Sequence, residues 1–189
     1  SLFRFLRKQG VYVKPEVTRA KYTPKPYDTP TLPGIKMQLD VKYVPKDCYV
    51  GKTDEKFYQY TIIDEATRER FIYAYNSHDS FTTVDFVLRS IIYFGYIPEI
   101  IQTDNGFEFT NNREKSDKSL HLFDELCKEL NIVHKLIKPR TPRHNGKVER
   151  SHRNDQERFY SFLSFFSLDD LNIQMKAYLK RSNNIPSSS

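Results

Sequence analysis

The feature of this sequence that most constrains its fold is a change of hydrophobic period along the chain. Three successive runs look like strands, and after them runs with helical spacing alternate with short apolar runs. Three sequential strands can form a meander, and the alternating helices then cover a mixed sheet. We therefore predict an α/β fold with a five-stranded mixed sheet and helices on both faces. The strand-like runs are 35–44, 57–64, 68–76, 98–104 and 132–138, and the helical runs are 80–94, 120–131, 141–159 and 167–184.

The segment before this pattern has a different composition. The stretch "SLFRFLRKQG" predicts a short basic amphipathic helix that ends at Gly10. Five prolines follow within residues 14–34, and proline at that density opposes both helix and central strand. We therefore expect an extended basic linker over 1–34, a compact core over 35–184 and a disordered tail over 185–189.

The positive charge is concentrated in two blocks. The whole chain carries +6, but residues 1–34 hold seven Lys/Arg against Glu16 and Asp28. Residues 135–153 hold seven Lys/Arg against Glu149 alone, which leaves the rest of the chain acidic. Two basic blocks on an acidic body favour a polyanionic partner, usually a phosphate backbone. Ordinary solvated surface charge is the alternative.

Several classes of protein are excluded by composition. No run approaches 18 apolar residues, so a membrane partner is not expected. Cys48 and Cys127 have no CxxC spacing and no close histidine, which argues against a disulfide framework or a structural zinc site. Cys127 lies on the apolar side of a helical run, so we expect it in the core. The cysteine usage fits a reducing, cytoplasmic compartment.

Three carboxylates in separate elements suggest a metal site. Asp40 lies on the polar face of the first strand, Asp104 ends a later strand, and Glu149 lies on a helix that begins at Thr141-Pro142 or at Asn145. Neighbouring parallel strands would bring the aspartates together, and a helix across the strand ends could add Glu149. Three carboxylates at one point repel one another unless a cation offsets them, and oxygen ligands suit Mg²⁺ or Mn²⁺. Two such ions, about 3.5–4 Å apart, can catalyse phosphodiester chemistry.

Each carboxylate also has a simpler interpretation. Asp40 could face solvent on an edge strand, and Asp104 in "DNG" could be a turn former. Glu149 lies four residues before Arg153, a spacing that forms helix ion pairs. Glu108, in the same "TDNGFEF" stretch as Asp104, is a competing third ligand.

At "QLDVKY", "QTDNGFEF" and "TPRHNGKVERSHR" the chain resembles the catalytic cores of DDE transposases and retroviral-type integrases, above all those of bacterial insertion sequences. The resemblance runs from about residue 35 to residue 184. It implies a ribonuclease-H-like fold in which Asp40, Asp104 and Glu149 are the catalytic and metal-binding triad. It also implies that 1–34 is a linker following an N-terminal DNA-binding region.

The function that this resemblance implies is metal-dependent DNA strand transfer. Water would first attack a phosphodiester at the end of a mobile element, and the freed 3′ hydroxyl would then attack target DNA. The resemblance also implies two Mg²⁺ or Mn²⁺ ions as cofactors and element-end and target DNA as partners. It further implies a homo-dimer or higher multimer on DNA and a bacterial cytoplasmic location, associated with the nucleoid. A nuclease of the same fold and a catalytically silent DNA-binding module are the alternatives.

One spacing departs from the family pattern. About 35 residues commonly separate the family's second Asp from its Glu, whereas 44 lie between Asp104 and Glu149 here, and a loop insertion at "NNREKSDKS" would explain most of the excess.

On the helical wheel, Arg153 and His152 share the face of Glu149, while Lys147 and Arg150 point away from it. By resemblance, the Arg153 position contacts element-end DNA. For Lys147, Arg150 and His144, ordinary surface positions are the alternative. The DNA-binding residues that we expect are Arg143, His144, Asn145, Lys147, Arg150 and Arg153.

Overall fold

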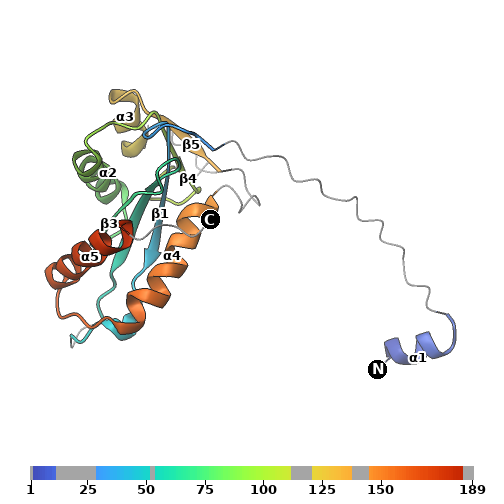
Figure 1. Cartoon of the computed structure of the whole chain (residues 1–189). Coiled ribbons are helices and arrows are strands. Elements are labelled where there is room, and N and C mark those ends of the chain that lie inside the picture. The colour runs from blue at the N-terminus through green and yellow to red at the C-terminus, as the bar shows by residue number, and fades with distance from the viewer. Residues whose placement is uncertain (1, 12–28, 52–53, 112–120, 138–144, 185–189) are drawn as a thin grey trace.

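The computed structural model describes five stretches of the chain, shown as coloured ribbon in Figure 1. These are residues 2–11, 29–51, 54–111, 121–137 and 145–184. The predicted order of strands and helices over the core is confirmed. The strands are β1 (Lys36–Tyr43), β2 (Tyr58–Asp64), β3 (Arg70–Tyr75), β4 (Ile100–Thr103) and β5 (Val133–Leu136). The helices are α1 (Leu2–Lys8), α2 (Ser80–Phe94), α3 (Leu122–Glu129), α4 (Gly146–Arg158) and α5 (Leu168–Asn183), with short 3₁₀ helices at Lys46–Cys48 and Tyr160–Phe162.

The five strands form one mixed sheet in the order β3-β2-β1-β4-β5. The chain first makes an antiparallel meander of β1, β2 and β3, and β4 and β5 then add in parallel on the other side of β1. β1 is therefore hydrogen-bonded along both sides. The alternative that placed Asp40 on an edge strand is wrong, because β1 is central.

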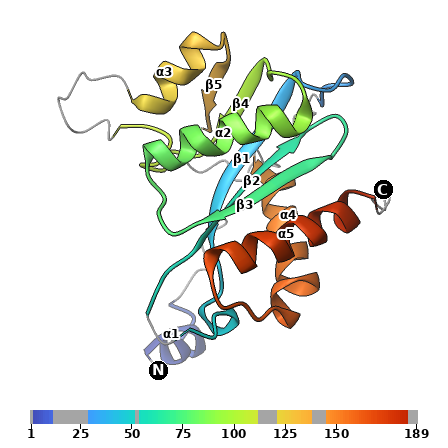
Figure 2. The ribbon, with the colours of Figure 1, turned by 90° about the vertical axis from the view of Figure 1, so that its left-hand side faces the viewer.

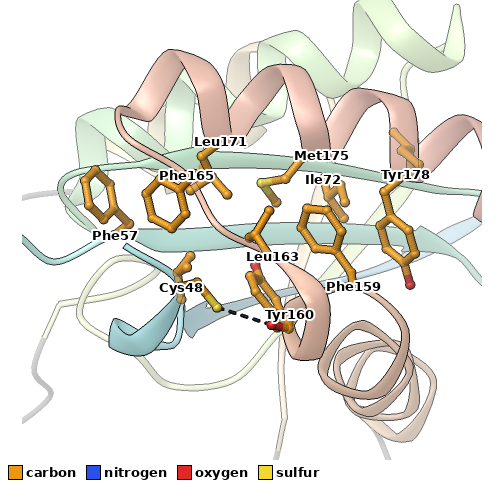
Figure 3. Packing of buried hydrophobic residues seen from close by; sticks show 13 residues of the cluster. Cys48, Phe57, Ile72, Phe159, Tyr160, Leu163, Phe165, Leu171, Met175 and Tyr178 are labelled. Atoms are coloured by element: carbon orange, nitrogen blue, oxygen red, sulfur yellow. Dashed lines mark hydrogen bonds between the residues drawn. The ribbon is translucent and has the colours of Figure 1, made fainter. Parts of the chain in front are cut away.

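Each face of the sheet has its own apolar cluster. α2 and α3 cover one face, and α4 covers the other (Figures 1 and 2). The cluster under α2 and α3 includes Cys127, which is 2% exposed, so its predicted place in the core is confirmed. Figure 3 shows the second cluster, where the rings of Phe159, at the end of α4, and Tyr160, in the 3₁₀ helix that follows, meet apolar side chains of β3 and α5. Its labelled members include Phe57, Ile72, Phe159, Tyr160, Phe165, Met175 and Tyr178.

α5 protects the β3 edge of the sheet. The amide side chain of Asn172 accepts from the backbone N–H of Ala74 at 2.8 Å and donates to its carbonyl at 3.0 Å. Asn183 makes the same pair of bonds with the backbone of Arg70, at 3.4 and 2.8 Å. Two asparagines thus pair with β3 as a further strand would, which removes unpaired backbone groups that could recruit another chain.

α4 rests on the sheet mainly through polar contacts. All 13 of its residues are described, and three are buried, of which only Val148 is apolar. The Nη1 atom of Arg70 in β3 lies 2.7 Å from Oδ1 of Asp155 in α4, and both side chains are almost fully buried. The same nitrogen donates to Ser151 of α4, and Gln59 of β2 donates to the second Asp155 oxygen at 2.7 Å. A helix with so little apolar surface depends on these polar contacts for its place.

The expectations for the two ends of the chain and for the start of α4 are met only in part by the described residues. The predicted basic helix before Gly10 is present as α1, and Gly10 has the left-handed φ of 68° that favours glycine. Most of the proline-rich linker, the tail over 185–189 and the Thr141-Pro142 helix start lie outside the described residues. α4 is described from Gly146, with Asn145 as its N-cap residue. None of the helices in the described stretches has the length and apolarity needed to cross a bilayer.

We predict that Asp155→Asn destabilises the protein by about 3 kcal/mol or more, because it leaves the buried Arg70 charge without its carboxylate. Urea unfolding followed by circular dichroism measures the change. Asp54→Asn, which breaks an exposed ion pair with Lys46, is the control and should leave stability unchanged within error. An Asp155→Asn variant as stable as the wild type would show that this pair does not hold α4.

Candidate active site

β1 and β4 bring the two aspartates together. The strands are parallel, and the register pairs Gln38 with Gln102. Asp40 and Asp104 each follow two residues later, Asp40 within β1 and Asp104 just past the end of β4, so they lie side by side on the same face of the sheet. The Asp40 carboxylate is mostly buried, with 19% of its side chain exposed, whereas Asp104 is exposed.

Asp104 also shapes the turn that follows β4. Its Oδ1 accepts the backbone N–H of Gly106 at 2.9 Å, and Asn105 donates to the carbonyl of Ile137 at 3.0 Å. The turn-former interpretation is therefore correct for one carboxylate oxygen, and it does not exclude a second role. A Cβ atom at Gly106 would lie 2.7 Å from the carboxyl group of Glu108, so a larger residue there would push the Glu108 side chain away.

The strand end that carries Asp104 is also fixed from the opposite face. The hydroxyl of Thr103 donates to the carbonyl of Asp104 at 2.9 Å and lies 2.8 Å from Nε2 of His134 in β5. Nδ1 of His134 lies 2.5 Å from a carboxylate oxygen of Asp124 in α3. This chain of contacts ties the Asp104 backbone to the β5–α3 side of the fold.

Glu149 reaches the site from α4. It lies in the first turn of the helix, exposed to solvent. The carboxylates of Asp104, Glu149 and Glu108 all act on Asp40 electrostatically. The structure thus brings Asp104, Glu149 and the competing Glu108 within electrostatic range of Asp40.

The environment of Asp40 disfavours its charged form. Burial and the nearby carboxylates of Asp104, Glu149 and Glu108 together raise the pKa of Asp40 to about 7, and burial is the largest cause. The N–H of Val41 donates to Asp40 at 2.9 Å and partly opposes this effect. Burial and the nearby Asp104 also raise the pKa of Glu108.

This anionic group fits a hard divalent cation. Its donors are carboxylate oxygens, and in the described stretches no lysine or arginine forms an ion pair with Asp40. As the described side chains stand, no three His, Cys, Asp or Glu groups already form a metal cage. A cation would offset the repulsion that raises the pKa of Asp40.

His152 lies against Asp40 on the α4 side. Its Nδ1 is 3.6 Å from Oδ2 of Asp40. Burial lowers the pKa of His152 to about 4, so at neutral pH the contact joins a neutral ring to the carboxyl group. Its Nε2 is buried and makes no hydrogen bond within the described stretches. The helical wheel placed His152 beside Glu149, but the contact with Asp40 requires the packing of α4 on β1.

The six predicted DNA-binding residues lie in different surroundings. Arg143 and His144 lie outside the described residues. Arg150 and Arg153 are exposed on α4 and stay predictions. Asn145 is 4% exposed.

Lys147 is directed toward the sheet. Its ammonium lies 3.0 Å from the carboxylate of the fully buried Glu65, and 13% of its side chain is exposed. Glu65 and its neighbour Gln38 were not recognised from the sequence. The polar side of the period-two pattern contains Gln38, but the pattern alone does not indicate burial.

Two family models match the chain. Both are described as "Integrase core domain"; one matches residues 30–142 and the other residues 130–185. The "Putative integrase ORF3" of Spiroplasma virus SpV1-C74 is 34% identical over 164 residues, which covers 82% of this chain and 44% of the relative. The "Putative transposase for insertion sequence element IS5376" of Geobacillus stearothermophilus is 29% identical, covering 97% of this chain and 48% of the relative. The chain spans less than half the length of either relative.

Solved structures are similar at the level of the fold. The simian T-cell lymphotropic virus intasome in complex with PP2A regulatory subunit B56 gamma has a chain with a TM-score of 0.70 and 19% identity, covering 91% of this chain and 56% of that one. The HTLV-2 integrase catalytic core domain in complex with magnesium, in its dimeric form, has a TM-score of 0.57 and 22% identity, covering 84% and 93%. The catalytic core domain of BIV integrase has a TM-score of 0.59 and 17% identity, covering 82% and 88%.

We predict that Asp40→Asn stabilises the metal-free protein at pH 8 by about 2–4 kcal/mol. In the unfolded chain Asp40 ionises near 3.8, whereas in the folded protein its pKa is about 7, so the fold loses stability as the pH rises between these values. The substitution removes that loss. Urea unfolding in EDTA at pH 5 and pH 8 measures it.

The exposed Asp169→Asn is the matched control and should leave this pH dependence unchanged. An Asp40→Asn variant less stable than the wild type at pH 8 without metal would contradict the raised pKa of the buried Asp40 carboxyl group.

Proposed function

Because the chain belongs to the integrase core domain family and has the ribonuclease-H-like fold of integrase catalytic cores, we propose that it is a DDE-type polynucleotidyl transferase that carries out DNA strand transfer. The reaction would serve transposition or integration. The observation that carries the proposal is the electrostatic coupling of Asp40 to Asp104 and Glu149, three carboxylates from three separate elements. A family match over residues 30–142 supports the same assignment independently.

We propose that Asp40, Asp104 and Glu149 hold Mg²⁺ or Mn²⁺, with two ions when substrate is present. When bound, such ions activate the attacking oxygen and stabilise the leaving oxygen of an in-line displacement. The oxygen donor set and the raised pKa of Asp40 support this choice of cation. One similar structure, the HTLV-2 integrase core, is a complex with magnesium.

The proposed reaction has two displacements at phosphorus. In the first, a water oxygen bonds to the phosphorus at the element end, and the bond from that phosphorus to the element's 3′ oxygen breaks. This oxygen takes a proton and becomes the freed 3′ hydroxyl. In the second, the freed 3′ hydroxyl bonds to a target phosphorus and a target 3′ oxygen leaves. One phosphodiester bond forms as one breaks in this second step, so it needs no external energy source and no covalent enzyme intermediate.

The protein's own residues would align and hold these groups. The Val41 N–H fixes Asp40, the neutral His152 ring lies against it, and the turn after β4 fixes the Asp104 carboxylate. Arg150 and Arg153 are exposed on the same helix as Glu149 and would bind backbone phosphates beside the reacting bond. Arg143 and His144 would add contacts from the segment before α4, and Asn145, which is 4% exposed, would need to become exposed to add one.

The wider setting is also part of the proposal. The partners would be element-end and target DNA, bound by a homo-dimer or a higher multimer. Residues 1–34 would link the core to an N-terminal DNA-binding region, with 185–189 as a disordered tail. The transposase relative from Geobacillus stearothermophilus favours a bacterial cytoplasm, with association to the nucleoid during the reaction.

We predict that Asp104→Asn and Glu149→Gln each lower strand joining by at least about 100-fold, because each removes an anionic ligand. The assay joins a 3′-recessed oligonucleotide duplex to a second duplex in Mg²⁺. Glu157→Gln, an exposed change farther along α4, is the control and should retain joining. Wild-type protein that cuts DNA but joins none would identify a nuclease of the same fold and overturn the proposed strand transfer.

We predict that Arg153→Ala weakens DNA binding and reduces the slope of log K against log salt concentration by about 1, since it removes one phosphate contact. Fluorescence anisotropy with an element-end duplex at several salt concentrations measures the slope. Lys176→Ala, an exposed change on α5, should leave the slope unaltered. A wild-type slope in the Arg153 variant would remove this residue from the DNA interface.

A further inference from the structure

The side chain of Gln38 connects β1 to the beginning of α4. It lies two residues before Asp40 on the same face of the strand and is 1% exposed. Its Oε1 accepts the backbone N–H groups of Lys147 at 3.1 Å and Val148 at 3.2 Å. These bonds join residues that are 109 and 110 positions apart in the sequence.

The bonds satisfy a need that α4 does not meet with its own N-cap residue. The first N–H groups of any helix have no partner within the helix, and a side chain of the preceding residue usually accepts from them. Asn145 occupies the N-cap position of α4 but makes no side-chain cap hydrogen bond. Its Oδ1 is buried and has no hydrogen-bond partner in the described stretches. Gln38 therefore performs from a neighbouring strand the role that an N-cap residue performs locally.

Glu65 fixes the orientation of the Gln38 amide. Nε2 of Gln38 donates to a carboxylate oxygen of Glu65 at 2.9 Å. A carboxylate accepts hydrogen bonds, so the NH₂ group must face Glu65 and the amide oxygen must face the helix. Glu65 is fully buried, and its charge is balanced by Lys36 and Lys147, each at 3.0 Å. Lys147 also donates to the Glu65 carbonyl at 3.1 Å, so the helix end is attached by both backbone and side chain.

This attachment lies beside the candidate active site. Glu149 is the residue after Val148, and Asp40 lies two residues beyond Gln38. α4 buries one apolar side chain, so apolar packing alone does not define how its first turn sits on β1. The Gln38 bonds do define it, because two adjacent N–H groups converge on one oxygen of the strand that carries Asp40.

We propose that Gln38 is a positioning residue, which caps α4 from β1 and thereby sets where the Glu149 carboxylate stands relative to Asp40. Its effect on divalent-cation affinity rests on the proposed function, whereas the cap itself does not. Loss of the cap frees the first turn of α4 and lets Glu149 move away from the two aspartates. Gln38 touches neither substrate nor metal in this role.

The test compares Gln38→Met with Gln59→Met in the full chain. Gln59 is a matched control, since it is also a buried glutamine that contacts α4, but it donates to Asp155 farther along the helix. Amide hydrogen exchange followed by NMR reports the first turn directly. We expect exchange at Lys147 and Val148 to accelerate roughly tenfold or more in Gln38→Met and to stay unchanged in Gln59→Met.

Titration with Mn²⁺ alone, followed by electron paramagnetic resonance, provides the second measurement. We expect Gln38→Met to weaken Mn²⁺ binding roughly tenfold, while Lys176→Ala, an exposed change on α5, binds as the wild type does. Unchanged exchange at Lys147 and Val148 in Gln38→Met would overturn the cap. Faster exchange with unchanged Mn²⁺ affinity would overturn its positioning role.

Two further outcomes are distinguishable. Wild-type protein that binds no Mn²⁺ would overturn the proposed function and, with it, the effect of Gln38 on cation affinity. The exchange rates of the Lys147 and Val148 amides would still show whether Gln38 caps α4. If Gln38→Met does not fold, the amide exchange rates of the wild-type protein show whether Gln38 caps α4. Lys147 and Val148 amides that exchange no more slowly than Asp169, the exposed second residue of α5, would overturn the cap.

Discussion

The polar contact between α4 and the sheet is the interaction on which the rest of the site depends. A helix packed through apolar side chains would need an apolar strand face beneath it, and such a face has no place for Asp40. Here the face of β1 is polar, and α4 is held by Gln38 and Glu65 at its start and by Arg70 farther along. Glu149 and His152 lie between these two attachments, so the helix is fixed on both sides of the groups that face Asp40.

The arrangement of Asp40 beside other carboxylates lowers the stability of the metal-free fold but leaves anionic ligands available to a cation. A buried Asp40 beside other carboxylates destabilises the metal-free fold at neutral pH, and its raised pKa expresses that cost. The buried pairs around it do not relieve the repulsion, since Lys36 and Lys147 are directed to Glu65 and Arg70 to Asp155. Positive charge inside the interface is thus used to hold the helix, which leaves the carboxylates available to a divalent cation.

Local periodicity was enough to predict the strands, the helices and their order, because these depend on near neighbours in the sequence. The three candidate carboxylates were predicted from the polar face of one strand, the end of another and a helix, together with a family resemblance. The roles of Gln38 and Glu65 were not predictable in the same way. Both depend on contacts to α4 that lie more than 80 residues away, and a polar residue on a strand gives no local sign of what will cover it. Lys147 shows the same limit, since a basic residue near a basic motif resembles a DNA contact until its buried partner is known.

The most direct test is a crystal of the full chain soaked in Mn²⁺ and measured at the manganese absorption edge. The account predicts an anomalous peak coordinated by carboxylate oxygens of Asp40 and Asp104, with Glu149 turned toward the same ion when DNA is present. An ordered site at saturating Mn²⁺ whose only peak lies away from Asp40, or a Glu149 side chain that stays remote from the ion with DNA bound, would contradict it.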